Sequence, residues 1–119
     1  MTVRAKILIV EDDPLIAMEM SERLEDMGYE ILGPAHTVED GARLGANQRP
    51  DAALLDANLH GKSSVELGVA LAASGVPIAF CTGYDEIKGL PAHLAKSPVL
   101  TKPIPDDQLK AALEKMLKK

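Results

Sequence analysis

Three acidic residues, a threonine and a lysine occur at the ends of short apolar runs, and such side chains could handle a metal ion and a phosphoryl group. In chain order they are Glu11, Asp12, Asp56, Thr82 and Lys102. Carboxylates brought together repel, so either a cation joins them or the pKa of one of them rises. Their oxygens suit a hard divalent ion, above all Mg²⁺. A hydroxyl and an ammonium group suit phosphoryl oxygens while one carboxylate acts as nucleophile.

The apolar runs are the elements that must bring these side chains together. Continuous branched or aliphatic runs are typical of strands buried on both faces. We expect strands at residues 7–10, 30–32, 52–55, 76–81 and 99–101. Gly33-Pro34 is expected to close the second strand, and residues 58–63 are expected to form a loop.

Segments with apolar residues at helical spacing separate these strands. We expect helices at residues 14–27, 37–48, 64–74, 90–96 and 105–119. Asp13 is expected to cap the first helix. In the third helix, Leu67, Ala70, Leu71 and Ser74 are expected to share one face.

Five strands that alternate with five helices predict an α/β fold, a doubly wound parallel sheet covered on both faces. In such sheets, ligands bind beyond the carboxyl ends of the strands. The acidic residues, Thr82 and Lys102 all fall at that edge. Without a repeat or a linker in the sequence, we expect one domain over residues 1–119.

Composition excludes several classes of protein. The net charge of −5, from 18 acidic and 13 basic residues, gives no reason to expect nucleic-acid binding. The single cysteine, Cys81, excludes an internal disulfide and is expected to be a small buried hydrophobe. No apolar run is long enough for a membrane span or signal sequence, so we expect a cytoplasmic protein without a membrane partner.

The set Glu11-Asp12, Asp56, Thr82 and Lys102-Pro103 resembles the receiver domain of two-component response regulators. This resemblance implies a flavodoxin-like sheet in the order 2-1-3-4-5. It implies that Asp56 accepts a phosphoryl group from a histidine kinase phosphohistidine. Glu11, Asp12, Asp56 and the backbone carbonyl of Asn58 would bind Mg²⁺, and the Lys102-Pro103 bond would be cis. Thr82 would bind a phosphoryl oxygen, and Lys102 would pair with the phosphoryl group.

Two departures from the common receiver pattern point to a subfamily. Most receivers place an aromatic switch residue three positions before the lysine, where this chain has Val99. Its fourth strand instead leads into Phe80-Cys81-Thr82-Gly83-Tyr84, which resembles the Phe-Ala-Thr-Gly-Tyr signature of the FAT-GUY subfamily. Members of that subfamily are often stand-alone receivers. Phe80 and Tyr84 are the candidate switch residues, although Tyr84 could equally be an ordinary loop aromatic.

The leading hypothesis is a phosphoacceptor signalling domain without enzymatic activity, whose partners are a sensor histidine kinase or a phosphotransfer protein and an unidentified effector. A phosphorylation-independent interaction domain is the first alternative. A small metal-dependent phosphohydrolase is the second, although Asn58 stands where haloacid-dehalogenase-type phosphatases have a second aspartate. His36, His60 and His93 have no metal-ligand spacing and are expected at the surface.

Overall fold

The computed structural model describes residues 4–59, 61–83, 94 and 97–118. Five parallel strands form the central sheet: β1 (Lys6–Val10), β2 (Glu30–Ala35), β3 (Ala52–Asp56), β6 (Ile78–Thr82) and β7 (Val99–Thr101). Their order is β2-β1-β3-β6-β7. In terms of the five expected strands this is the order 2-1-3-4-5, so the predicted doubly wound, flavodoxin-like α/β fold is confirmed.

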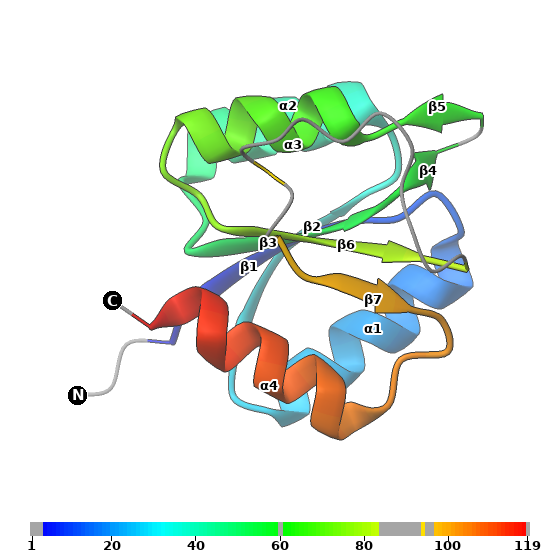
Figure 1. Cartoon of the computed structure of the whole chain (residues 1–119), viewed down its shortest axis with the longest axis vertical. Helices are drawn as coiled ribbons and strands as arrows, with labels where there is room; N and C mark the ends of the chain where they lie inside the picture. The colour runs from blue at the N-terminus through cyan, green and yellow to red at the C-terminus, as the bar shows by residue number, and fades with distance from the viewer. Residues whose placement is uncertain (1–3, 60, 84–93, 95–96, 119) are drawn as a thin grey trace.

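Helices cover both faces of the sheet (Figure 1). They are α1 (Pro14–Asp26), α2 (Val38–Gln48), α3 (Val65–Ala73) and α4 (Asp106–Leu117). Figure 1 shows α2 and α3 on one face and α1 and α4 on the other. The predicted helix over residues 90–96 lies outside the described residues, apart from Leu94, which is buried.

Alternation along the strands builds two apolar layers. Toward α1 and α4, Ile7 and Ile9 pack with Leu24 and Leu109. Toward α2 and α3, the alternate strand residues pack instead, among them Leu8, Val10, Leu55 and Phe80. Successive side chains of a strand point to opposite faces, so a strand in the middle of the sheet must be apolar throughout. This is the pattern of residues 7–10.

The second strand runs past the point where it was expected to end. It continues through Gly33 and Pro34 to Ala35, with a shift in register against β1 and a cis Gly33–Pro34 bond. Gly33 has φ +93°, and a Cβ there would meet the backbone nitrogen of Ala35 at 2.6 Å, so only glycine fits. Proline is tolerated because β2 is an edge strand, and the Ala35 carbonyl still accepts from the Glu11 N–H at 2.9 Å.

The predicted loop over residues 58–63 is wrong in part, because it contains a small antiparallel hairpin. Its strands are β4 (Asn58–Leu59) and β5 (Lys62–Ser63). Gly61, at φ +83°, donates its N–H to the Asn58 side-chain oxygen at 2.8 Å. An asparagine side chain that bonds its own turn, with glycine in the left-handed region, is a turn signal.

The third helix faces the sheet with a different set of residues from the expected one. Leu67 and Leu71 are buried as expected, but Ala70 and Ser74 are exposed. Gly68 takes the inward position, where an added Cβ would lie 2.8 Å from Phe80 Cζ and from Ile78 Cδ1. The missing side chain therefore lets α3 approach β6 closely.

Candidate functional site

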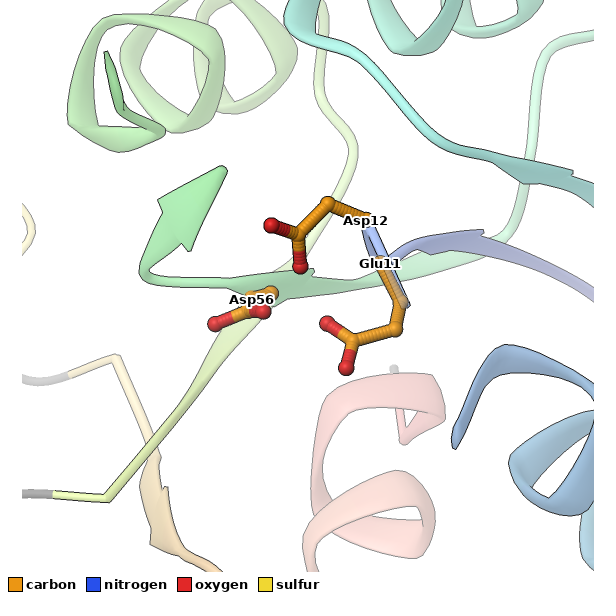
Figure 2. A group of neighbouring side chains, drawn as sticks. All are labelled: Glu11, Asp12 and Asp56. Carbon is orange, nitrogen blue, oxygen red and sulfur yellow. The ribbon is translucent and has the colours of Figure 1, made fainter. Parts of the chain in front are cut away.

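The predicted acidic residues converge at the carboxyl edge of the sheet (Figure 2). Glu11 and Asp12 directly follow β1, and Asp56 ends β3, the strand that pairs with β1. One carboxylate oxygen from each of the three residues lies within 4.8 Å of the others. The parallel pairing of β1 and β3 thus brings three carboxyl groups into one cluster.

Lys102 directly follows β7, which pairs with β6 on the side away from β3, and its side chain reaches the acidic cluster. Its Nζ lies 3.2 Å from Glu11 Oε1 and 3.4 Å from Asp56 Oδ2. The Lys102 side chain is 28% exposed and that of Asp56 12%, so these are partly desolvated ion pairs. Burial lowers the pKa of Lys102, but the charges of Asp56 and Glu11 outweigh it and leave the pKa raised. The ammonium group is therefore held in its charged form beside Asp56.

Glu11 is the most desolvated of the acidic residues. It is 5% exposed, and its Oε2 is buried with no hydrogen-bond partner among the residues that the structure describes. The apolar side chains of Ile16, Met20 and Leu54 line the small cavity beside it. Burial, and then the neighbouring Asp56 carboxylate, raise the pKa of Glu11 to about 8, against a partial opposing effect of Lys102.

Thr82 lies at the same edge, as the last residue of β6, and is buried. Its carbonyl accepts the Lys102 N–H at 2.7 Å, so these two candidate phosphoryl-binding residues are joined through the backbone. The bond that follows, Lys102–Pro103, is cis, as the resemblance implied. Asn58 lies in β4, and its N–H donates to Asp56 Oδ1 at 3.3 Å. The six residues predicted to bind the metal ion or the phosphoryl group therefore lie at one edge of the sheet.

The two candidate switch aromatics differ in what the structure describes. Phe80 is completely buried, and its ring packs on α3 at Gly68. That packing gives Phe80 a place in the apolar layer beneath α2 and α3, not at a surface. Tyr84 lies outside the described residues. Between them, Cys81 is buried, and burial raises the pKa of its thiol to about 12, so it is the predicted small hydrophobe and not a reactive thiolate.

Asp13 has the predicted role of a helix cap. Its Oδ1 accepts from the Leu15 N–H at 2.9 Å and from the Ile16 N–H at 3.4 Å at the start of α1. Two adjacent aspartates therefore divide their work. Asp12 contributes to the acidic cluster, and Asp13 fixes the helix that follows.

His36 is a neighbour of the site that sequence reasoning missed. It is exposed, as predicted, but its Nδ1 lies 2.9 Å from the Glu11 carbonyl oxygen. The same rule that found the other residues would have found His36, because it directly follows β2. It was missed because the strand was expected to end at Gly33-Pro34. His60 and His93 lie outside the described residues.

The donor set fits a hard divalent cation. Three carboxylates face one lysine, so the cluster carries more negative than positive charge. One of its oxygens, Glu11 Oε2, is buried and has no hydrogen-bond partner in the described ranges, which is costly without a counter-charge or a proton. Oxygen ligands of this kind are those that Mg²⁺ prefers.

The family described as "Response regulator receiver domain" matches residues 7–114 of the chain. The match spans all the candidate site residues and the whole sheet except its first residue, Lys6. The chain therefore belongs to the receiver domain family of response regulators, the signalling domains of two-component systems. In the described part of the chain, no helix has the length and apolar character needed to cross a bilayer.

Individual relatives agree with this family. The chain is 37% identical to SdrG from Sphingomonas melonis Fr1, covering 99% of this chain and 100% of that one, with a TM-score of 0.81. It is 34% identical to the signal receiver domain of a modulated diguanylate cyclase from Desulfovibrio desulfuricans G20, covering 97% and 94%, with a TM-score of 0.83. Similarity over the whole SdrG chain agrees with the expected likeness to stand-alone receivers.

Among curated proteins, the chain is 34% identical to the phyllosphere-induced regulator PhyR of Methylorubrum extorquens over 84 residues. That match covers 68% of this chain and 32% of PhyR. The chain spans less than half the length of the curated relatives it matches.

Proposed function

We propose that this receiver domain accepts a phosphoryl group on Asp56 from a phosphohistidine of a sensor histidine kinase or a phosphotransfer protein. The observation that carries the proposal is the position of Lys102, whose ammonium lies 3.4 Å from Asp56 Oδ2 and 3.2 Å from Glu11 Oε1. A charged donor at that distance can hold an oxygen of the incoming group without moving far.

In the proposed transfer, Asp56, Lys102 and Thr82 each have a separate role. An Asp56 carboxylate oxygen forms the new P–O bond, while the P–N bond of the phosphohistidine breaks and its electron pair stays on the imidazole nitrogen. Lys102 would pair with the phosphoryl oxygens, and the Thr82 hydroxyl would donate a hydrogen bond to one of them.

We propose Mg²⁺ as the cofactor, held by Glu11, Asp12, Asp56 and the backbone carbonyl of Asn58. The ion would supply positive charge against the carboxylates and the phosphoryl oxygens. The charge excess of the cluster and the unpaired Glu11 Oε2 support this assignment.

We propose a switch and not an enzyme as the outcome of phosphorylation. The residue two positions after Asp56 is Asn58, whose amide cannot transfer a proton as a carboxyl can and whose Oδ1 accepts from the Gly61 N–H. Phosphorylation would instead draw Thr82 toward the new group and alter a surface that a protein partner binds. Turnover of a panel of phosphoesters that depends on Asp56 would overturn this part of the proposal.

The remaining expectations are proposals of the same kind. We propose that residues 1–119 form one receiver domain, supported by the family match over residues 7–114 and by one sheet that carries both apolar layers. A cytoplasmic location and the lack of a nucleic-acid partner stay predictions from composition.

The test is the intact mass of the protein after incubation with Mg²⁺ and a small phosphodonor. We expect one phosphoryl adduct on the wild type and none on Asp56→Asn. Asp40→Asn is the matched control, because Asp40 on α2 is also paired with a basic side chain, 2.7 Å from Arg43, but lies outside the cluster. No adduct on the wild type, or an equal adduct on Asp56→Asn, would contradict the proposal.

A further inference from the structure

We propose that Arg23 of α1 is a positioning residue for Lys102, because its guanidinium holds the segment on which Lys102 is placed. The inferred consequence for phosphoryl transfer rests on the function proposed above, whereas the positioning itself concerns the fold. Arg23 lies far from Lys102 in sequence and contributes nothing to the carboxylate cluster.

The guanidinium of Arg23 contacts three separate groups. Its Nη2 donates to the Ile104 carbonyl oxygen at 2.6 Å. Its Nε donates to Asp106 Oδ1 at 2.8 Å, and its Nη1 lies 3.4 Å from Glu19 Oε1. The Arg23 side chain is only 21% exposed, whereas those of Asp106 and Glu19 lie mostly in solvent. Exposed ion pairs contribute little, so the bond to the Ile104 backbone is the contact that matters most.

Ile104 is two residues from Lys102, and this short span is held at both ends. At one end, the Lys102 N–H donates to the Thr82 carbonyl at 2.7 Å. At the other end, Arg23 holds the Ile104 carbonyl while the Ile104 side chain is buried in the layer beneath α1 and α4. The Lys102 ammonium reaches Glu11 and Asp56 from a backbone fixed in this way.

The identity of the residue follows from its geometry. Arginine presents several N–H donors in a rigid fork, whereas lysine has a single nitrogen on a flexible stem. In the structure Nη2 lies 2.6 Å from both the Ile104 carbonyl oxygen and Asp106 Oδ1. The lysine side chain ends one bond short of the Nη2 position, so a lysine nitrogen at position 23 would not reach both groups from the same backbone, and it could not replace the Nε contact as well. Arg23→Lys therefore keeps the charge and removes the fork.

The position of α1 connects the two sides of the site. The helix begins directly after the acidic pair Glu11-Asp12, and Asp13 caps its first turn. Three turns later it carries Arg23, which holds the segment that follows Lys102. The same helix thus sets the acidic residues and the lysine relative to each other.

The test follows Lys102 in the metal-free protein by NMR, through hydrogen exchange of its backbone amide and through its side-chain signals. We expect Arg23→Gln and Arg23→Lys to speed exchange of the Lys102 amide roughly tenfold, the effect of losing one charge-assisted hydrogen bond, and to shift its side-chain signals. Arg43→Gln is the matched control, since Arg43 forms an exposed ion pair with Asp40 on α2. It should leave Lys102 unchanged.

A second variant separates the backbone bond from the ion pair. Asp106→Asn removes the carboxylate but leaves the Ile104 carbonyl for Arg23, so Lys102 should behave as in the wild type. A folded Arg23→Lys protein with wild-type Lys102 exchange and signals would overturn the proposal, as would an equal change in Asp106→Asn. These measurements need no phosphorylation, so a failure of the proposed function would show separately, as a wild type that takes up no phosphoryl group.

For the reaction itself, we expect Arg23→Lys to take up the phosphoryl group from a small phosphodonor more slowly than the wild type, at a temperature at which both proteins are folded. An unchanged rate in a variant with displaced Lys102 signals would show that the positioning has no part in transfer and would overturn that half of the inference.

Discussion

At the scale of single residues, Glu11 is the acidic residue of the site whose charged form is most disfavoured by its surroundings. Its carboxyl group is buried beside Asp56, and within the described part of the chain both acids pair with the same cation, Lys102. A carboxylate in such surroundings is stabilised by a proton or by a metal ion. The raised pKa of Glu11, about 8, means that the proton is the stabilising partner when no metal ion is bound.

This raised pKa predicts how the metal-free protein responds to pH. The folded state binds the Glu11 proton more tightly than the unfolded chain does, since the ordinary value is 4.5 and the folded value about 8. The bound proton of Glu11 therefore stabilises the fold fully below the unfolded pKa of 4.5, and this stabilisation is lost as the pH rises through the folded pKa of about 8. We therefore expect the denaturant concentration at the unfolding midpoint, measured in chelator, to decrease as the pH is raised from about 5 to about 9.

Glu11→Gln should flatten that profile, because glutamine has no proton to lose. Glu39→Gln is the matched control: Glu39 is exposed on α2 and paired with Lys62 at 3.4 Å, and its pKa is lowered. It should keep the wild-type slope. A wild-type slope in Glu11→Gln would show that another group causes the pH dependence.

At the scale of elements, the start of α1 depends on Asp13. Asp13→Ala removes two hydrogen bonds to the first-turn N–H groups and should lower the free energy of unfolding by about 1 kcal/mol. Asp13→Ser restores a capping oxygen and should recover most of the loss. Urea unfolding measures both. An Asp13→Ala protein that unfolds like the wild type would contradict the capping role.

Two adjacent serines at the start of α3 should respond in opposite ways. The Ser63 hydroxyl accepts from the Val65 N–H at 3.1 Å, whereas the Ser64 hydroxyl is completely buried and has no hydrogen-bond partner among the described residues. Ser63→Ala should cost about 1 kcal/mol of unfolding free energy. Ser64→Ala should leave that free energy unchanged or raise it by up to about 1 kcal/mol, because it removes an unsatisfied polar group.

Unfolding in urea distinguishes the two serine variants directly, since each serves as the control of the other. A larger loss in Ser64→Ala than in Ser63→Ala would contradict the assignment. It would mean that the buried hydroxyl has a partner in solution.

At the scale of the whole molecule, the sheet was predictable because strands in its middle must be apolar on both faces. Residues 7–10 and 52–55 carry that signal, and the resemblance supplied the strand order. The site was predictable for a related reason. Parallel strands end at one edge, so polar residues at the ends of separate strands come together there without any contact being known in advance.

The features that the sequence did not predict depend on the context of an element in the fold, which the spacing of apolar residues does not encode. Gly33-Pro34 normally ends a strand, but an edge strand can include proline. Because the strand was expected to end at Gly33-Pro34, His36 was not recognised as the residue that follows it, beside Glu11. The inward place of Gly68 in α3 follows from how closely the helix approaches Phe80, a tertiary contact. The Arg23 bridge likewise joins segments 81 residues apart and has no local signal.

The most direct test of a phosphoacceptor at Asp56 is chemical trapping of the acyl phosphate. Borohydride reduces an aspartyl phosphate to homoserine, and peptide mapping by mass spectrometry then identifies the position. After incubation with Mg²⁺ and a small phosphodonor, we predict homoserine at position 56 and nowhere else, with none formed in chelator. Homoserine at position 12 or 51, the corresponding reduced glutamate (5-hydroxynorvaline) at position 11, or no homoserine at position 56 in a phosphodonor-treated wild type would contradict the assignment.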